Sequence, residues 1–346
     1  MKKIKLNIKK KNQNYPLIIG PNIVQNFSKI VKINNLKISK FFFVLDKNVP
    51  KKMIKKLISS VNHKNKITYY FNATEKNKVQ KSVDIVLDNM LKNNFSRNDC
   101  LVAVGGGITG DITAYAASLF KRGINFINVP TTLLAQVDSS IGGKTGVNTK
   151  NGKNLIGTFY QPKIVISDTN FLKTLSKREI ICGYAEIFKH SIISNKKFFS
   201  YLDKNIDKIL KLKSPFIEKS IFESCKIKKN IVEKDEKETG LRKTLNLGHT
   251  FAHAYEATLK YSKKLNHGEA VILGIKSALN FSYKKKLINY ENYHEIIDHI
   301  KKSNLPNILS KYFFFKDIKK ITSYMANDKK NKSDKINLIL LKKNWN

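Results

Sequence analysis

Cysteine is scarce in this 346-residue sequence, which contains only Cys100, Cys182 and Cys225. The three lie far apart and form no CxxC pair, so a disulfide-stapled scaffold is excluded. We therefore expect a reduced compartment and a cytoplasmic protein. Long apolar runs are also missing: no stretch reaches about 18 apolar residues, so neither a membrane span nor a membrane partner is expected. The basic segment 1–16 lacks the apolar core of a secretory signal.

Arginine is scarce as well, although the chain is strongly basic. Lysine and arginine number 65 against 26 acidic residues, for a formal net charge of +39. Only four of these cations are arginine: Arg97, Arg122, Arg178 and Arg242. Proteins that grip phosphate backbones draw heavily on the planar arginine fork. Lysine is spread evenly here, which indicates a drift of overall composition, so no nucleic-acid partner is expected. The charge would instead steer small anionic substrates toward the protein.

Hydrophobic patterning divides the chain into two halves. The first half has a helical pattern at 78–94 and short apolar runs typical of buried strands at 40–49, 99–105, 125–132 and 163–169. Strands that alternate with helices predict a mostly parallel sheet. The second half shows amphipathic helical spacing near residues 198–210, 217–225, 272–279 and 290–300. The sequence thus predicts an α/β domain at 1–178 and a helical domain at 179–346.

A glycine loop joins one predicted strand to a helix. Residues 104–111 read VGGGITGD and contain the pattern G-x-G-x-x-G at Gly105, Gly107 and Gly110. Glycines at such a turn let the backbone approach a pyrophosphate, and the helix N-terminus favours its negative charge. The acidic residue that binds a ribose about 20 residues further on is missing, because Val129 and Pro130 stand there. Dinucleotide binding and a plain tight turn both remain open on this pattern.

A long polar motif occupies residues 129–162, VPTTLLAQVDSSIGGKTGVNTKNGKNLIGTFYQP. It is dense in glycine, serine, threonine, asparagine and lysine, yet apolar residues recur through it. Long loops in compact domains are usually functional. Lys144, Lys153 and Asn154 would supply donors for an anionic ligand. The alternative is an irregular surface loop.

Three of the seven histidines fall in one short window. His249 and His253 are four residues apart in the helical pattern LNLGHTFAHAYE, and His267 follows in NHGEAV. Residues at i and i+4 share a helix face, and a catalytic zinc ion takes three protein ligands. Together with Glu186 of GYAEIFKH, the histidines indicate a metal site that includes the i, i+4 pair. The alternative is a pair of histidines held by hydrogen bonds at a helix–helix contact.

Six motifs together resemble those of the 3-dehydroquinate synthases, the second enzymes of the shikimate pathway. They are GGGITGD, VPTTLLAQVDSSIGGKTGVN, GKNLIGTFYQP, GYAEIFKH, GLRKTLNLGHTFAHAYE and HGEAV, in the order of that family. The likeness extends from Asp46 to residues 328–330. It implies an N-terminal α/β NAD-binding domain, an all-α C-terminal domain, an active site between them and a homodimer. Ala252, where the family usually has glycine, and Tyr255, where an aliphatic residue is common, affect local geometry rather than chemistry.

The resemblance also assigns roles to residues. It implies that Glu186, His249 and His267 hold a zinc ion, which cobalt can replace, and that His253 lies near the substrate phosphate instead. The implied NAD contacts are Asp46, Glu75, Lys78, Gly106, Gly107, Asp111, Thr131, Thr132, Lys144, Lys153 and Thr174. The implied substrate contacts are Asp138, Lys144, Asn154, Lys189, Lys228, Arg242, Asn246 and His253, with Arg122 reaching the neighbouring subunit's site and one lysine of Asp328-Lys329-Lys330 contacting phosphate.

The family converts 3-deoxy-D-arabino-heptulosonate 7-phosphate to 3-dehydroquinate and phosphate. Transient oxidation by NAD acidifies a C–H bond, phosphate is eliminated, the hydride returns, and an aldol closure follows. The cofactor carries the hydride while the protein supplies orientation and electrostatics. The resemblance therefore implies a lyase that uses NAD and zinc or cobalt on a sugar phosphate. The alternatives are another sugar phosphate cyclase, such as 2-deoxy-scyllo-inosose synthase, whose substrate offers no carboxylate to Lys228 and Arg242, and a metal-dependent polyol dehydrogenase.

Overall fold

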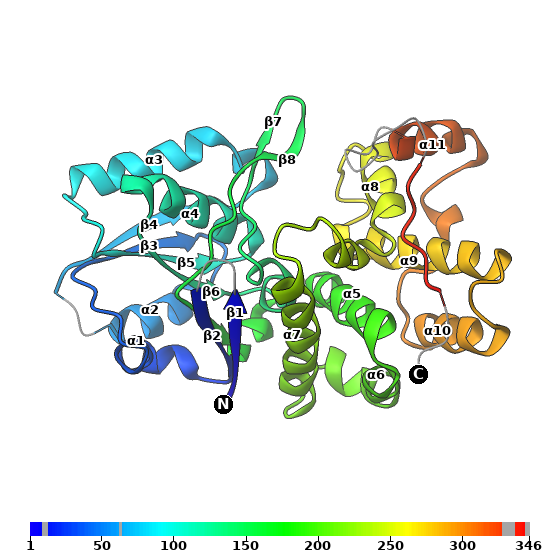
Figure 1. The fold of residues 1–346 in the computed structure, drawn as a ribbon, viewed down its shortest axis with the longest axis horizontal. Coiled ribbons are helices and arrows are strands. Elements are labelled where there is room, and N and C mark those ends of the chain that lie inside the picture. The colour runs from blue at the N-terminus through cyan, green and yellow to red at the C-terminus, as the bar shows by residue number, and fades with distance from the viewer. Residues whose placement is uncertain (9–12, 62–63, 327–335, 343–346) are drawn as a thin grey trace. The chain divides into compact units, whose positions relative to one another are not determined.

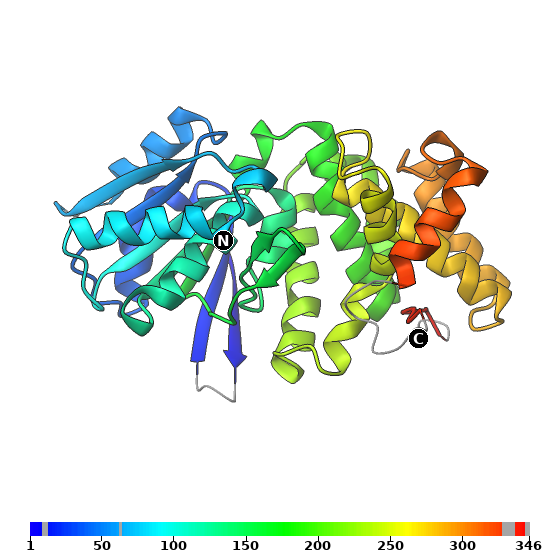
Figure 2. The ribbon, with the colours of Figure 1, turned by 90° about the horizontal axis from the view of Figure 1, so that it is seen from above.

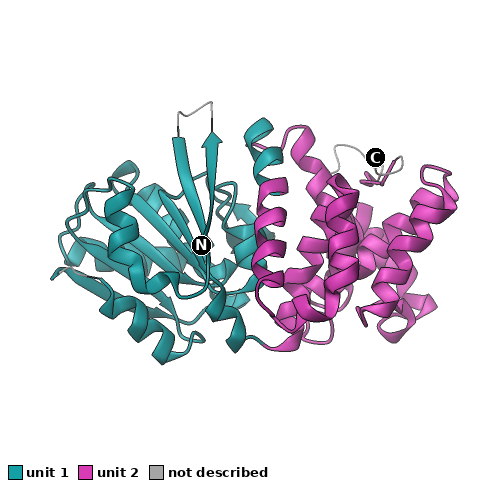
Figure 3. Cartoon of the chain, turned by 90° about the horizontal axis from the view of Figure 1, so that it is seen from below, with its two compact units in different colours: residues 1–175, 228–236 teal, residues 176–227, 237–346 magenta. Residues whose placement is uncertain are grey.

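The computed structural model describes residues 1–8, 13–61, 64–326 and 336–342, and the chain divides into two compact units (Figure 3). Unit 1 comprises residues 1–175 and 228–236, and unit 2 comprises residues 176–227 and 237–346. The division after residue 178 remains a prediction about domains. The lysines at 329 and 330 lie outside the described residues.

Unit 1 is built on a seven-stranded sheet in the order β1-β2-β9-β6-β5-β3-β4. Its strands are β1 (Lys2–Ile8), β2 (Gln13–Gly20), β3 (Phe41–Asp46), β4 (Lys66–Phe71), β5 (Cys100–Gly105), β6 (Asn125–Pro130) and β9 (Ile164–Asp168). Neighbouring strands are parallel throughout, except that β1 pairs antiparallel with β2. The predicted, mostly parallel sheet is therefore confirmed.

Helices cover both faces of this sheet. In Figures 1 and 2, α1 (Phe27–Ile33) and α2 (Lys51–Ser59) lie on one face, and α3 (Gln80–Lys92) and α4 (Gly107–Leu119) lie on the other. The long polar motif at 129–162 contains a separate two-stranded hairpin, formed by β7 (Val147–Thr149) and β8 (Gly152–Ile156). A sheet covered on both faces requires strands that are apolar on both sides, which explains their continuous apolar runs.

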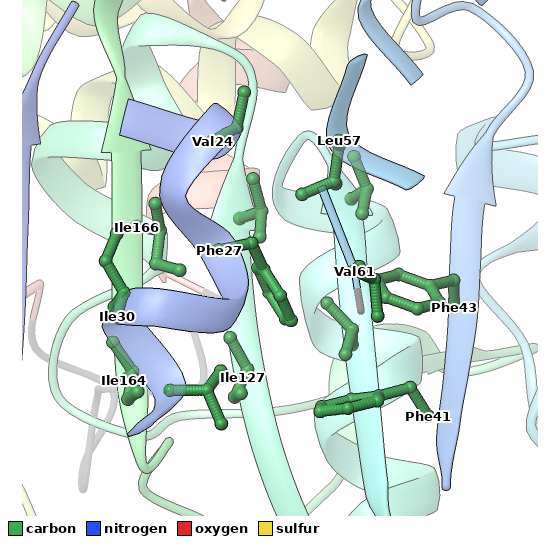
Figure 4. Close-up of a cluster of buried hydrophobic side chains, with 14 of the residues drawn as sticks. Val24, Phe27, Ile30, Phe41, Phe43, Leu57, Val61, Ile127, Ile164 and Ile166 are labelled. Carbon is green, nitrogen blue, oxygen red and sulfur yellow. The ribbon is translucent and has the colours of Figure 1, made fainter. Parts of the chain in front are cut away.

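Strand β3 shows how one short sequence serves two cores. All six residues of FFFVLD are buried. Side chains alternate along a strand, so Phe41 and Phe43 join one cluster, with Phe27 of α1, while Phe42 and Val44 join the other. Figure 4 shows the first cluster, in which the rings of Phe27 and Phe41 meet edge-on at 5.7 Å between centroids. Burying each such ring stabilises the fold by about 1.5–3 kcal/mol.

The sheet reverses its strand order between β3 and β5. The chain passes from β3 to β4 on one side and then returns to β5 on the other side of β3. The carboxyl ends of these neighbouring strands are Asp46 and Gly105, and β6 ends beside them at Pro130. Open α/β sheets bind ligands at the carboxyl ends of the strands beside such a reversal. The topology thus directs attention to the glycine loop.

Unit 2 is helical, and the structure assigns no strand to any described residue after Asp168. Its helices are α5 (Lys177–Ser194), α6 (Lys196–Leu210), the first part of α7 (Phe216–Lys234), α8 (His249–Thr258), α9 (His267–Lys284), α10 (Tyr290–Lys302) and α11 (Ile318–Ala326). Capping boxes fix the starts of α5 and α9, and an Arg178–Glu269 ion pair joins these two starts at 2.5 Å. None of the helices in the described ranges is both long and apolar enough to cross a membrane.

A buried polar network lies in the core of unit 2. The Tyr184 hydroxyl is 2.8 Å from Nε2 of His299, and Nδ1 of His299 is 2.8 Å from Oδ1 of Asp203. Burial lowers the pKa of His299, and the opposing effect of Asp203 does not restore it. The imidazole is therefore held neutral inside the helical core.

Acid should destabilise the protein through this histidine. Because the folded-state pKa of His299 lies below its ordinary value of 6.5, the unfolded chain takes up a proton in mild acid that the folded chain does not. Each pH unit below that value then lowers the free energy of unfolding by up to about 1.4 kcal/mol. Urea denaturation between about pH 7 and pH 5 should show a shallower loss in His299→Gln than in the unaltered chain. Equal slopes would contradict this account.

Candidate active site

Glu186, His249 and His267 come from three different helices of unit 2 to one point. One ligand atom from each lies within 4.8 Å of the other two. Glu186 is 1% exposed, and its Oε1 is buried without a hydrogen-bond partner, with Nε2 of His249 3.7 Å away. A buried carboxylate oxygen is costly when nothing pairs with it. One carboxylate and two imidazoles form a donor set typical of catalytic zinc, so these residues fit a zinc or cobalt ion.

The other oxygen of Glu186 is already engaged. Lys189, one turn further along α5 and 2% exposed, donates to Oε2 of Glu186. The ion pair stabilises the buried negative charge and directs Oε1 toward the histidines. Lys189 was expected to contact substrate, and the structure places it beside the predicted metal ligand.

Close contacts between helix backbones bring the two histidines that are predicted as metal ligands into place. A Cβ atom at Gly268 would lie 2.2 Å from Cα of Cys182, so α9 approaches α5 right after His267. A Cβ atom at Gly274 would lie 2.2 Å from the carbonyl oxygen of Gly248, which immediately precedes His249. Gly248 also adopts φ +79°, a conformation that favours glycine. No other residue permits these approaches, and each one fixes the position of an adjacent histidine.

All three histidines of the sequence window lie together. The ring of His253 is 5.5 Å from that of His249 and 6.4 Å from that of His267 between centroids. His253 nevertheless does not belong to the metal-compatible group found among the described residues of unit 2. His249 and His253 thus share a face of α8, as their spacing requires. The residues grouped with His249 are instead His267 of α9 and Glu186 of α5. The ligand assignment itself stays a prediction.

Of two acidic residues that the sequence motifs do not single out, Glu256 contacts this group and Glu238 contacts Asn246. Oε2 of Glu256 is 3.0 Å from Nδ1 of His267. Burial acts to lower the pKa of His267, but the hydrogen bond and the charge of Glu256 outweigh it and raise that pKa. Glu238 accepts a hydrogen bond of 2.5 Å from the side-chain amide of Asn246. For Glu256 a signal was present, because it follows His249 by seven residues and so shares its face of α8.

Asn246 and Arg242 lie in one short 3-10 helix, Leu241–Asn246, directly before His249. The guanidinium-bearing side chain of Arg242 is only 3% exposed. Placing an arginine there, in a chain with three other arginines, indicates a need for its planar fork.

In unit 1, the glycine loop lies at the carboxyl ends of β3, β5 and β6. A Cβ atom at Gly105 would lie 2.8 Å from Cβ of Asp46, and Thr131 donates its backbone N–H to the Gly105 carbonyl at 2.9 Å. Added Cβ atoms at Gly106 and Gly107 would crowd Thr132 and Ser139 at 3.2 and 3.0 Å. The loop therefore packs too closely against its neighbours to carry side chains, and its position at the start of α4 fits a pyrophosphate.

One acidic residue, Asp46, does lie beside the glycine loop. A Rossmann fingerprint places such a residue about 20 residues after the glycines. The strand order instead puts β3, which precedes the loop in sequence, beside β5. Asp46 therefore stands next to the glycine loop, with Oδ1 accepting from the backbone N–H of Asn48 at 2.9 Å.

Charged residues expected to contact NAD form a second cluster beside α4. Lys78 is 6% exposed, pairs with Asp111 and donates to Oδ1 of Asn154 at 2.6 Å. Burial raises the pKa of Asp111, and Lys78 opposes that rise. Nζ of Lys153 lies 3.4 Å from Oε1 of Glu75. Glu75 and Lys78 thus lie among the other residues that are predicted to contact NAD.

Asp138 lies in a single π-helical turn, Ala135–Ser139. Such turns recur at functional sites. Lys228 is 5% exposed and donates to both the carbonyl and Oδ1 of Asp138, at 2.6 and 2.5 Å. The pair joins two predicted substrate contacts that are 90 residues apart in sequence.

The remaining predicted residues of unit 1 are placed individually. Lys144 is exposed and forms an isolated antiparallel bridge with Phe159. Thr174 donates its hydroxyl to the Phe171 carbonyl at 2.7 Å. Arg122 is exposed at a turn with φ +64°.

Gly268→Ala should increase the separation of His267 from Glu186 and His249. The added methyl would force α9 away from α5, which should lower the free energy of unfolding by about 1–3 kcal/mol. The same shift should weaken zinc affinity at least about tenfold, the loss typical of a disturbed ligand shell. Chelator competition and urea denaturation measure the two effects. Gly110→Ala is the control, because its Cβ atom would meet nothing closer than 3.4 Å. Unchanged zinc affinity in Gly268→Ala would contradict this role.

Comparison with known families covers both halves of the chain. The family model described as 3-dehydroquinate synthase N-terminal matches residues 68–182, and the one described as 3-dehydroquinate synthase C-terminal matches residues 183–331. The chain is 56% identical over 340 residues to a 3-dehydroquinate synthase of Pelagibacter ubique (strain HTCC1062), covering 98% of this chain and 92% of the relative. It is 42% identical to one of Bartonella quintana (strain Toulouse), covering 94% and 88%.

Solved structures share the fold at lower identity. A 2-deoxy-scyllo-inosose synthase, complexed with carbaglucose-6-phosphate, NAD+ and Co2+, superposes with a TM-score of 0.84 at 24% identity, covering 97% of this chain and 89% of that one. A 2-epi-5-epi-valiolone synthase from Streptomyces hygroscopicus subsp. jinggangensis 5008, with NAD+ and Zn2+ bound, gives 0.80 at 23%, covering 90% and 86%. A probable glycerol dehydrogenase from Sinorhizobium meliloti 1021 gives only 0.66 at 15%, covering 90% and 89%. On the family matches and these identities, the chain belongs to the 3-dehydroquinate synthase family.

Proposed function

We propose that this protein converts 3-deoxy-D-arabino-heptulosonate 7-phosphate to 3-dehydroquinate and phosphate, as a carbon–oxygen lyase of the shikimate pathway. The observation that carries the proposal is the 56% identity to a 3-dehydroquinate synthase over 98% of the chain. The close grouping of Glu186, His249 and His267 supports it independently, because a metal-dependent cyclase needs such a group.

NAD and a zinc or cobalt ion are the proposed cofactors. When bound, NAD would accept and return a hydride, and the metal ion would polarise the substrate's oxygens. Structural neighbours contain NAD+ with Co2+ or Zn2+, which supports the choice. Glu186, His249 and His267 would hold the metal. The glycine loop, Asp46 and the cluster around Lys78 and Asp111 would hold NAD, as would the other predicted contacts Thr131, Thr132, Lys153 and Thr174.

The substrate carries two anionic groups, and we assign separate partners to each. Lys144, Asn154 and His253 would bind the phosphate through charge-assisted hydrogen bonds. Lys228 and Arg242 would bind the carboxylate, and both are nearly fully buried, so their charges act at low local dielectric. The net charge of +39 would raise the local concentration of such a doubly anionic substrate.

Asp138 and Asn246 would orient the reacting carbons. Each is held by a partner of its own: Lys228 donates to Asp138, and Glu238 accepts from Asn246. Side chains fixed in this way lose little entropy when the substrate arrives, which lowers the barrier for ring opening and closure. Lys189, held against Glu186, would add a cation beside the metal ligands.

We further propose a cytoplasmic homodimer in which Arg122 serves the neighbouring subunit's site. The exposure of Arg122 on a turn of unit 1 supports this role. The buried Lys228 and Arg242 favour a carboxylated substrate over that of a 2-deoxy-scyllo-inosose synthase. The identity of 24% to that enzyme, against 56% to a 3-dehydroquinate synthase, favours the same choice.

Two histidine variants test the assignment together. His267→Ala removes a proposed metal ligand, so zinc content should fall well below one per chain, with weak residual binding still measurable by chelator competition, and phosphate release should fall to background. His253→Ala removes a proposed phosphate contact, so zinc content should stay at one per chain while phosphate release falls at least about a hundredfold. Metal analysis and a phosphate-release assay read the two effects. Loss of zinc in His253→Ala with retention in His267→Ala would restore the i, i+4 pair as the metal site.

A further inference from the structure

One face of α8 carries three polar side chains aimed at the same group. His249, His253 and Glu256 stand at positions i, i+4 and i+7, so they line a single stripe of the helix. The first two face one another at 5.5 Å between ring centroids, and the third reaches His267 at the start of α9. Glu256 is 9% exposed, and a carboxylate so buried requires a partner.

The contact fixes which nitrogen of His267 is available. Oε2 of Glu256 lies 3.0 Å from Nδ1 of His267, and a carboxylate can only accept, so Nδ1 carries the hydrogen. Nε2 is then the ring nitrogen left to present a lone pair. His249 follows the same pattern, because its Nδ1 lies 3.3 Å from the Leu247 carbonyl and its Nε2 is 3.7 Å from Glu186 Oε1.

We propose that Glu256 is a positioning residue that holds the His267 imidazole in the Nδ1–H tautomer and in the ring orientation required to bind a divalent transition metal through Nε2. The inference rests on the proposed metal site of Glu186, His249 and His267. Metal-binding histidines commonly donate their other ring N–H to a carboxylate, which also makes the ligand nitrogen more basic. Glu256 thus acts on the metal only through His267, and it contributes from the helix that already supplies His249.

The test is zinc affinity, measured by chelator competition without any assay of turnover. Glu256→Ala should weaken zinc binding about 10–100-fold, the usual effect of losing such a partner. Glu256→Gln keeps the side-chain volume and an accepting oxygen but lacks the charge, so its affinity should fall between those of the alanine variant and the unaltered chain. Should Glu256→Ala fold poorly, a loss in Glu256→Gln still decides the point. Glu179→Gln is the charge-matched control, because the Glu179 side chain accepts hydrogen bonds from Ser176 in the capping box of α5.

A double-mutant cycle separates positioning from general structural support. In a His267→Ala background, the further change Glu256→Ala should alter zinc affinity by less than about twofold, since its target is gone. A loss in that background as large as in the unaltered chain would overturn the inference, as would unchanged affinity in both single Glu256 variants. If His267→Ala alone leaves zinc affinity unchanged, the proposed metal site and this inference both fall. A loss in His267→Ala without one in the Glu256 variants overturns this inference alone.

Discussion

The close approach of α9 to both α5 and α8 is the constraint on which the chemistry of unit 2 depends. Gly268 lies against the backbone of Cys182, and Gly274 lies against Gly248, at distances that leave no space for a side chain. Because His267 and His249 directly adjoin these glycines, backbone packing rather than side-chain flexibility sets the distance between the ligand atoms. The Arg178–Glu269 pair at the starts of α5 and α9 supports the same contact. The buried Glu186 then meets two imidazoles in a group that a metal ion would complete.

In unit 1, topology brings the predicted NAD contacts together in a comparable way. Parallel strands place all their carboxyl ends at one edge, and the reversal between β3 and β5 leaves the glycine loop beside Asp46. Around this edge the charged side chains are paired: Lys78 with Asp111, Lys153 with Glu75, and Lys228 with Asp138. Pairing restricts where these lysines lie before a ligand binds. A few of the many lysines are therefore held in place by ion pairs with carboxylates.

The sequence was informative wherever one segment determines its own structure. Strands β3, β5, β6 and β9 and helix α3 were predicted because their apolar residues are buried locally. Strand β1 was missed, although Ile4, Leu6 and Ile8 alternate with polar residues, because abundant lysine obscured the pattern. Spacing related His249 to His253 but not to His267, since spacing describes one helix and the third histidine comes from another. Spacing places an acidic residue downstream of the glycines and does not point to Asp46, because only the strand order reveals that β3 lies beside β5. The family resemblance supplied the ligand set that spacing lacked, but neither indicated the backbone contacts of Gly268 and Gly274.

The most direct test of the account follows phosphate release from 3-deoxy-D-arabino-heptulosonate 7-phosphate, with NAD present in amounts far below the substrate. The account predicts many turnovers per NAD, no accumulation of NADH, arrest on chelation and recovery when zinc or cobalt is restored. Such behaviour requires the hydride to return within each turnover, as only a cyclase of this type would show. Accumulation of NADH with a polyol, together with no phosphate release by folded and metal-loaded protein, would contradict the account and indicate a dehydrogenase.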